Sequence, residues 1–527
     1  MAPTDERDQR EVIAFLETPS TYGEGVERVE RIETHSALVV LAGALAYKLK
    51  RAVLYPYLDF STLERRRYFC EAELRLNRRT APTLYRDVVP VVRGPGGRLE
   101  LGGSGTPVDW LLRMRRFDQD ALLDRLAARN ALDVALMPPL GKAIADLHTG
   151  AERRPDHGGL AGMLWVIDGN TLGFAEQGAG ILDAGACERV TMRARAALEQ
   201  HADRLEARRE EGFVRVCHGD LHLRNIVIVD GRPTLFDAIE FNDRLSCIDV
   251  LYDLAFVLMD LWRIGLRSHA SVLFNAYLDG THDVSGLELL PLFLGCRSAV
   301  RAKTNATAAR LQSEPAKART LETAAREYLA AAEVFLQPGR AGLLAVGGLS
   351  GTGKSTLARR LAAATGAPPG AVVLRSDVIR KSLFGLPATS RLGPEGYTKS
   401  VNDRVYQALA ERAAEVLRAG HTAIVDAVFG RACERGRIAD VASAAGAPFT
   451  GLWMDAPLNV LTDRVQRREA DASDATAEVV GRQQARHDAE SIEGWARIDA
   501  SGSVDEVQRR AEAAILHAYE DVRERQV

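Results

Sequence analysis

The chain has 527 residues, more than a single hydrophobic core usually supports, so we expect two or three domains. Its hydrophobic fraction of 46% and charged fraction of 26% are typical of globular proteins. A formal net charge of −3 excludes a general electrostatic attraction to nucleic acid or to anionic membranes, so any anion binding must be local.

The six cysteines lie far apart with no CxxC pair, which fits neither a disulfide framework nor a zinc site. The N-terminus carries charges of both signs, and the longest apolar run, Ala37 to Tyr47, is too short to span a bilayer. We therefore expect a cytoplasmic protein with no membrane partner.

The first part of the chain mixes strand and helix patterns up to a break at residues 337–340, where the proline and glycine of QPGR end a helix. We place a domain boundary there, which gives residues 1–338 and 339–527. The elements predicted before it are strands over residues 37–50 (two, joined by a turn), 88–92, 111–117, 214–229 (interrupted by HGDLH) and 233–236, helices over residues 61–77, 249–262 and 289–336, and a glycine-rich loop, GPGGRLELGGSG.

After the boundary, strands alternate with helices. The predicted strands cover residues 342–346, 371–374, 421–425 and 449–454. Strands separated by helices of this length are typical of a parallel sheet with helices on both faces. The second domain is therefore predicted to be an α/β domain.

The sequence GLSGTGKS over residues 348–355 matches the P-loop pattern and stands between a predicted strand and a predicted helix. Its glycines let backbone N–H groups wrap phosphates, its lysine reaches the β and γ phosphates, and its serine can hold Mg²⁺. We therefore predict an ATP and Mg²⁺ site. The predicted nucleotide-binding residues are Gly348, Gly351, Gly353, Lys354, Ser355 and Thr356.

Polar residues follow the next two strands of this domain. SDVIRK places Asp377 and Arg380 at the carboxyl edge of the sheet, where ligands of open α/β sheets bind. We predict that Asp377 orients or deprotonates an acceptor hydroxyl and that Arg380 holds a phosphate or carboxylate. The alternative is that Asp377 only caps the following helix. Asp426 ends the next strand and is a candidate for holding Mg²⁺ in the manner of a Walker-B carboxylate.

Arg464 and Arg468 lie one turn apart on a predicted helix, and as a lid they would bring positive charge to the transition state. The alternative is a solvated charged helix. The P-loop, SDVIR and these arginines resemble the small P-loop kinases that phosphorylate hydroxyls, a group containing gluconate kinase, adenylyl sulfate kinase, the kinase part of polynucleotide kinase and zeta toxins. The resemblance covers residues 343–484 and implies an acceptor that is a small molecule or a nucleic-acid 5′ end.

The first domain carries HGDLHLRN over residues 218–225, followed by FDAIEFN from residue 236. This order of an Asp, an Asn and a later Asp is the protein-kinase constellation. We predict that Asp220 orients the acceptor hydroxyl, that Asn225 binds one Mg²⁺, and that Asp237 chelates Mg²⁺ across the phosphates. Glu240 is a further candidate for metal or substrate contact.

Lys48 and Lys50 in AYKLK lie two residues apart on one face of a strand, and one of them is expected to grip the α and β phosphates. We favour Lys48. Its predicted ion-pair partner is Glu73 on the following helix, with Glu71 as the alternative.

Over residues 31–332 these motifs, together with IADLH and DVLYDLAF, resemble the aminoglycoside phosphotransferase-like family. The whole chain resembles bifunctional aminoglycoside phosphotransferase/ATP-binding proteins, which fuse such a domain to a P-loop domain. This implies an α+β protein-kinase-like fold for the N-terminal domain. An aminoglycoside is a polycation, however, and the C-terminal helix here carries Arg297, Arg301 and Lys303. If that helix face lines the acceptor site, the substrate is anionic or neutral.

The sequence thus favours an enzyme with two ATP- and Mg²⁺-dependent phosphotransferase sites acting on hydroxyls of small molecules. One alternative is a nucleotide-binding regulatory protein with one inactive module. Another is a nucleic-acid or nucleotide-sugar kinase of the polynucleotide kinase or zeta-toxin type, against which the near-neutral charge and the lack of basic aromatic stripes count. Both acceptors and the oligomeric state stay open.

Overall fold

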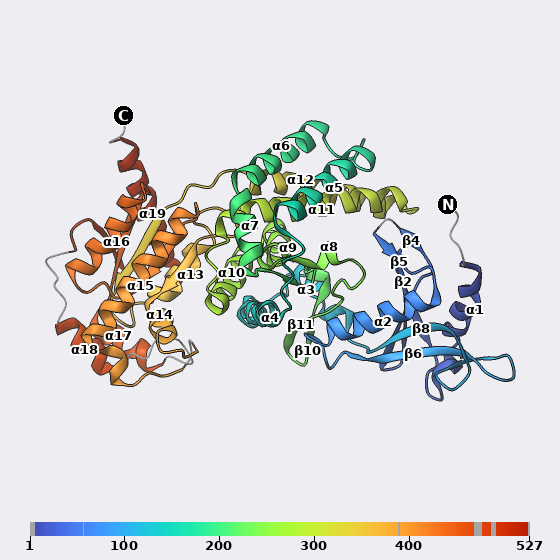
Figure 1. Cartoon of the computed structure of the whole chain (residues 1–527). Coiled ribbons are helices and arrows are strands. Elements are labelled where there is room, and N and C mark those ends of the chain that lie inside the picture. The colour runs from blue at the N-terminus through green and yellow to red at the C-terminus, as the bar shows by residue number, and fades with distance from the viewer. Residues whose placement is uncertain (1–5, 56, 388–389, 468–476, 486–491, 525–527) are drawn as a thin grey trace. The chain divides into compact units, whose positions relative to one another are not determined.

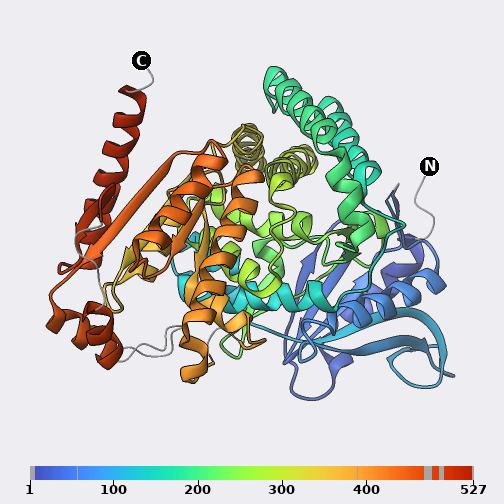
Figure 2. The same cartoon turned by 60° about the vertical axis from the view of Figure 1, so that its left-hand side comes forward.

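The computed structural model describes residues 6–55, 57–387, 390–467, 477–485 and 492–524 (Figures 1 and 2). By its internal contacts the chain divides into two units: Met1–Val166 with Ala202–Val257, and Ile167–His201 with Leu258–Val527. All six cysteines are described, and all six are free thiols. Within these described ranges, no helix is long and apolar enough to span a bilayer.

A six-stranded antiparallel sheet, with strand order β1-β2-β3-β8-β6-β7, opens the first unit. Leu49 of β3 packs into a core with α1 (Glu6–Leu16), so its neighbours Lys48 and Lys50 lie on the opposite face, toward α2 (Leu63–Asn77). The strands are β1 (Val29–Glu33), β2 (Ala37–Ala42), β3 (Leu45–Lys50), β6 (Tyr85–Arg93), β7 (Leu99–Leu101) and β8 (Thr106–Arg115).

The rest of the first unit carries the HGDLH loop between two short strand pairs. Strand β9 precedes the loop, and β10 and β11 form a hairpin after it, which confirms the predicted strand, loop, strand order. The partner of β9 is β12, which follows the hairpin in the chain and pairs antiparallel with β9. The elements are β4 (Leu54–Tyr55), β5 (Leu58–Asp59), α3 (Leu123–Ala128), α4 (Met137–Gly150), α7 (Ala202–Glu211), β9 (Val214–Val216), β10 (Ile226–Val229), β11 (Arg232–Leu235), α8 (Asp243–Ser246) and β12 (Cys247–Asp249). Helices α5 (Gly159–Glu176) and α9 (Val250–Arg263) begin in the first unit and end in the second.

The second unit includes helices that precede residue 338. The helix predicted over residues 289–336 is two helices, because Glu314 has an extended backbone and Pro315 starts a new helix at its first turn. These helices are α6 (Ala184–Gln200), α10 (Arg267–Thr281), α11 (Leu290–Leu311) and α12 (Pro315–Phe335). The domain boundary at residue 338 stays a prediction, since contacts group the chain differently.

A five-stranded parallel sheet of order β14-β15-β13-β16-β17 forms the core of the P-loop region (Figure 2). One face packs against α13 and α19 in a core that includes Leu344, Leu357 and Val507, and α15 and α16 contact its strands as well. The predicted α/β architecture is confirmed. The elements are β13 (Leu343–Gly348), α13 (Lys354–Ala362), β14 (Val372–Arg375), α14 (Ser376–Ser382), α15 (Lys399–Arg418), β15 (Ala423–Asp426), α16 (Ala432–Ala444), β16 (Phe449–Asp455), α17 (Leu458–Gln466), α18 (Ala477–Ala485), β17 (Trp495–Asp499) and α19 (Val504–Glu524).

Candidate functional site

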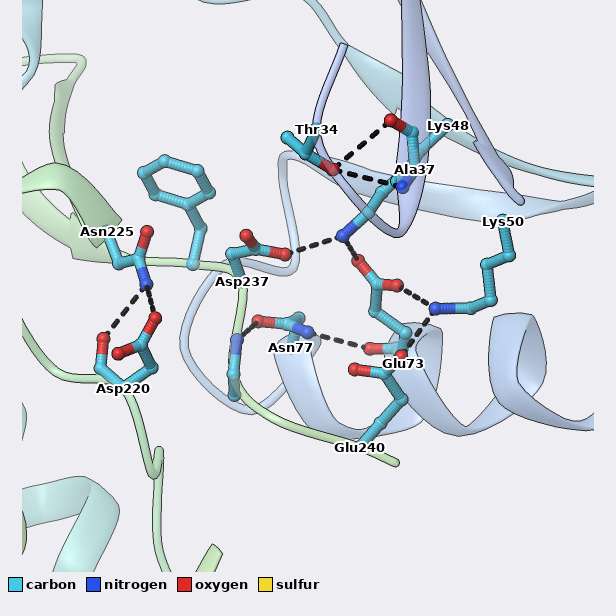
Figure 3. Close-up of polar contacts among 12 residues, drawn as sticks. Thr34, Ala37, Lys48, Lys50, Glu73, Asn77, Asp220, Asn225, Asp237 and Glu240 are labelled. Carbon is cyan, nitrogen blue, oxygen red and sulfur yellow. Dashed lines mark hydrogen bonds and ion pairs between the residues drawn. The ribbon is translucent and has the colours of Figure 1, made fainter. Parts of the chain in front are cut away.

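Both lysines of β3 reach the buried carboxylate of Glu73 (Figure 3). Lys48 Nζ donates to Glu73 Oε1 at 2.8 Å and to Asp237 Oδ1 at 2.7 Å. Lys50 Nζ donates to Glu73 Oε2 at 2.6 Å and also pairs with Glu240. Burial acts to lower the pKa of Lys48, but Asp237 and Glu73 outweigh it and hold that pKa well above its ordinary value. The charged Lys48 therefore stands beside Asp237, which suits the phosphate-gripping role predicted for it.

The carboxylate of Glu73 fits the predicted ion-pair role better than that of Glu71. Glu73 is 0% exposed, whereas Glu71 is exposed and pairs with Arg67 at 2.9 Å on the same helix. Burial raises the pKa of Glu73, but the Lys48 and Lys50 ammoniums lower it below its ordinary value. Glu73 is thus an ionised carboxylate held between the two lysines.

The backbone around Asp237 is fixed by side chains from other elements. Asp237 has φ of 63°, in the left-handed region, and its N–H donates to the Tyr85 hydroxyl at 3.0 Å. The next N–H, of Ala238, donates to Asn77 Oδ1 at 2.8 Å, and Asn77 Nδ2 donates to the Glu73 carbonyl at 3.0 Å (Figure 3). A non-glycine residue is held in this conformation only where its surroundings determine it, as at many functional sites.

The loop over residues 218–225 is anchored by the carboxylate of Asp253 on α9. This carboxylate accepts from the backbone N–H groups of residues 218 and 219 at 3.0 and 2.9 Å, and it lies 3.1 Å from His148 Nε2. Asn225 Nδ2 donates to Asp220 Oδ2 at 3.1 Å and to the Asp220 carbonyl at 2.9 Å (Figure 3). The loop therefore brings Asp220 and Asn225 together, as their predicted roles require.

The glycines of the P-loop allow a close approach that other residues would block. Gly348 and Gly351 have φ of 132° and 91°, and a Cβ on them would lie 2.5 Å from the Met454 carbonyl and 2.6 Å from the Leu461 carbonyl. Gly353, with φ of 90°, is the N-cap of α13. The helix N-terminus and the loop amides thus stand where a phosphate would bind.

The residues that follow the glycines are set for Mg²⁺ and phosphate. Ser355 Oγ donates at 2.5 Å to Asp426 Oδ2, a carboxylate that is 4% exposed at the end of β15. A hydroxyl and a carboxylate are the oxygen donors that Mg²⁺ prefers, so this pair fits the predicted metal site. Lys354 Nζ donates to the Leu349 carbonyl at 2.8 Å, and Thr356 is exposed on the first turn of α13.

Asp377 and Arg380 lie on α14, at the carboxyl edge of the sheet. The N-cap of α14 is Arg375, so the alternative in which Asp377 is the N-cap does not describe this helix. Burial, together with the neighbouring Asp426, raises the pKa of Asp377. Arg380 is buried and donates to the Gly396 carbonyl at 2.8 Å. Its guanidinium carbon lies over the ring of Tyr397, 4.8 Å from the ring centre.

Two further buried arginines border this edge and were not predicted. Arg375 ends β14, with its Nε 3.6 Å from Asp426 Oδ2. Arg435 of α16 donates to the Phe429 carbonyl at 2.6 Å. The sequence signal for Arg375 was its place directly before SDVIRK, whereas Arg435 matches no spacing that we used.

The predicted lid arginines are only partly described. Arg464 on α17 donates to the Ala500 carbonyl at 2.9 Å and lies 3.4 Å from the Gly502 carbonyl, and Arg468 lies outside the described residues. Among the described residues of this region, Gln483 of α18 makes a hydrogen bond to the P-loop, and its Oε1 accepts from the Ser350 N–H at 2.9 Å. The lid role of the arginines stays a prediction.

The basic face of α11 is engaged in packing within the second unit. Arg297 is buried, and the Arg301 guanidinium lies 5.4 Å from the ring of Tyr328. Lys303 Nζ donates to the Gly169 carbonyl at 3.1 Å, and burial lowers its pKa. The three basic side chains of α11 are therefore held by packing contacts, and these contacts do not identify the acceptor of the N-terminal module.

The fold and these two residue sets define a chain of two kinase-type modules, a phosphotransferase by class. Family profiles agree: the phosphotransferase enzyme family matches residues 60–287, and an AAA domain matches residues 343–489. The chain is 30% identical over 483 residues to the uncharacterized proteins Rv2004c of Mycobacterium tuberculosis and Mb2027c of Mycobacterium bovis, across 89% of this chain and 92% of each relative. It belongs to the family of these mycobacterial proteins.

Solved structures of single kinases are also similar to parts of the chain. A choline/ethanolamine kinase family protein from Mesorhizobium loti shares 15% identity, covering 62% of this chain and 99% of its own, with a TM-score of 0.38. A gluconokinase from Sinorhizobium meliloti 1021 shares 20% identity, covering 35% of this chain and 98% of its own, with a TM-score of 0.28. Likeness at these levels says nothing about the acceptors of this chain.

Proposed function

We propose that the chain is an ATP-dependent phosphotransferase with two donor sites, each transferring the γ-phosphate of ATP to a hydroxyl of a small molecule with Mg²⁺ as cofactor. The observation that carries the proposal is that Lys48 Nζ donates to both Glu73 Oε1, at 2.8 Å, and Asp237 Oδ1, at 2.7 Å. These contacts join β3, α2 and the segment after β11. This is the arrangement that phosphoryl transfer of the protein-kinase type requires.

In the N-terminal module, the main task of the protein side chains would be to position ATP and the acceptor hydroxyl for direct phosphoryl transfer. Lys48 would bind the α and β phosphates, and Asp220 would orient the acceptor hydroxyl and take its proton. Asn225 and Asp237 supply the oxygen ligands for Mg²⁺, which when bound offsets the negative charge on the phosphates. The hydrogen bonds from Asn225 to Asp220 keep the loop in one conformation for this task.

In the P-loop module, the amides at the start of α13, with Lys354, would hold the β and γ phosphates. Ser355 and Asp426 would hold the metal. The raised pKa of Asp377 makes it a better base toward a hydroxyl than an ordinary aspartate. Buried guanidiniums at this edge, Arg380 among them, favour an acceptor that is anionic or neutral.

The acceptors that we propose are small molecules and not nucleic acid, because the net charge of −3 offers no general attraction to a polyanion. We also propose a cytoplasmic location, where ATP is at hand and the six cysteines stay free thiols.

The test uses full-length protein, γ-labelled ATP and a small-molecule extract. We expect two sets of labelled products, one lost at least about 100-fold in Asp220→Ala and the other lost similarly in Lys354→Ala. Glu71→Gln, which removes an exposed carboxylate on α2, should keep both.

Other outcomes would favour other functions. ATP binding by the wild type without any labelled product would indicate a regulatory nucleotide-binding protein. Label on a 5′-hydroxyl oligonucleotide, lost in Asp377→Ala, would indicate a nucleic-acid kinase.

A further inference from the structure

A second lysine–carboxylate pair lies directly beside Lys48 and Glu73 (Figure 3). Lys50 Nζ contacts both Glu73 Oε2, at 2.6 Å, and the carboxylate of Glu240. The side chains of Lys50 and Glu240 are 2% and 5% exposed, so their charges have little access to water. A buried ion pair of this kind is costly to desolvate, and in some proteins such pairs are kept because they fix one arrangement of the chain.

The position of Glu240 links this pair to the metal site. Glu240 stands three residues after Asp237, on the same segment that leaves β11. That segment is tied to β3 and α2 at three points: Lys48 at Asp237, Asn77 at Ala238, and Lys50 at Glu240. The contact with Lys50 is the last of the three and fixes the far end of the segment.

The pair also sets the charge around Glu73. Each lysine takes a different oxygen of this carboxylate, Oε1 for Lys48 and Oε2 for Lys50. Burial raises the pKa of Glu240, and the Lys50 ammonium opposes that rise.

We propose that Lys50 and Glu240 are a positioning pair that fixes the metal-ligating segment Asp237–Glu240 against β3 and keeps Glu73 Oε1 directed to Lys48. The proposal rests on the proposed function of the N-terminal module. It assigns neither residue a contact with the reacting atoms. Loss of the pair should therefore loosen the metal site before it affects any other part of the reaction.

The experiment measures binding of a non-hydrolysable ATP analogue to the full chain by calorimetry, over a range of Mg²⁺ concentrations. The chain carries Lys354→Ala to silence the P-loop site. We expect Lys50→Met and Glu240→Gln each to raise the half-saturating Mg²⁺ concentration about 10- to 100-fold, the usual effect of losing a residue that supports metal ligands. Glu71→Gln, which removes a carboxylate two residues before Glu73, should behave as the background protein does.

The double variant Lys50→Met/Glu240→Gln separates positioning from stability. It leaves no unpaired charge, so its melting temperature should recover relative to either single variant. Its half-saturating Mg²⁺ concentration should stay raised, because the segment is still untied. If the single variants do not fold, the half-saturating Mg²⁺ concentration of the double variant alone tests the proposal.

Three results would overturn the inference. Folded variants with the background Mg²⁺ dependence would show that the pair is structural only. If Mg²⁺ no longer promotes binding of the analogue to Glu240→Gln, while Lys50→Met keeps the Mg²⁺ response of the background protein, Glu240 would be a metal ligand and not a positioning residue. If the background protein binds no nucleotide at any Mg²⁺ concentration, the proposed function fails and this inference with it, a failure distinct from the other two.

Discussion

The imidazole of His421 is a buried group whose ionisation the fold opposes. It stands two residues before β15 and is 2% exposed, and burial lowers its pKa to about 4. In the unfolded chain the same group titrates near ~6.5. Between these values the unfolded state binds a proton that the folded state does not, so the stability contributed by the neutral imidazole is lost as pH falls.

We therefore predict that His421→Gln makes the protein less sensitive to acid. The wild type should lose on the order of 3 kcal/mol of stability between pH ~6.5 and pH ~4 through this group, and the variant should not. Thermal unfolding at several pH values measures it, and the difference between the two proteins isolates the imidazole from the other groups. His517→Gln, at an exposed position, should follow the wild type. Equal slopes for wild type and His421→Gln would contradict the prediction.

At the residue scale, the motifs indicated candidate site residues, but they did not indicate which side chains contact one another. Motif order made Asp220 and Asp237 candidates, because kinase chemistry requires those side chains in that order. It could not divide the tasks of Lys48 and Lys50, since both lie on one strand face and both reach Glu73. Only packing shows that Lys48 meets Asp237. Side chains that fix the backbone there, such as Tyr85, belong to no motif and were not foreseen.

Helices α17 and α18 pack onto the P-loop through a small apolar cluster. Leu349 of the P-loop lies against Leu461, Val465 and Val480. Gln483, one turn after Val480 on α18, accepts a hydrogen bond from the Ser350 N–H of the loop at 2.9 Å. A phosphate that uses this amide must first displace the side-chain carbonyl.

We predict that Gln483→Ala raises the affinity of the P-loop module for nucleotide about 3- to 10-fold, the value of one hydrogen bond that no longer has to be broken. Titration of the Lys48→Met protein with a non-hydrolysable ATP analogue reports on this module alone. Gln466→Ala, an exposed position on α17, is the matched control and should leave the affinity unchanged. A fall in affinity for Gln483→Ala would mean that this side chain holds the nucleotide and does not compete with it.

At the element scale, even short strands such as β11 and β14 were predicted, but others, β7 and β17 among them, were missed. Strand β7 lies inside the segment predicted as a loop, because its three residues between glycines are too few to show a period. Strand β17 was also not foreseen. Its first residue, Trp495, packs its ring where a Cβ on Gly451 of the neighbouring strand would stand, and no local pattern reports such a contact. Strand β7 is too short to show a pattern although its partner β6 is close in sequence, whereas β17 depends on a partner strand more than 40 residues away.

For the whole molecule, the sequence predicted two modules because each carries its chemistry in local motifs that do not depend on the rest of the chain. How the helices before residue 338 group depends on packing, and their contacts place them with the P-loop sheet in one unit. The two proposed donor sites each lie within a single unit, with Lys48 and Asp237 in the first and Lys354 and Asp426 in the second.

Two separate donor sites predict two equivalents of nucleotide bound per chain. In calorimetry with a non-hydrolysable ATP analogue and Mg²⁺, the wild type should bind two, and Lys48→Met and Lys354→Ala should bind one each. Each substitution removes charge-assisted hydrogen bonds to phosphate and should weaken its own site about 10- to 100-fold. The combined variant should bind none at the same concentrations, because neither site shares a residue with the other. A wild type that binds one equivalent, lost with only one of the two lysines, would mean that the other module is not a nucleotide site, and would leave a single phosphotransferase centre in the chain.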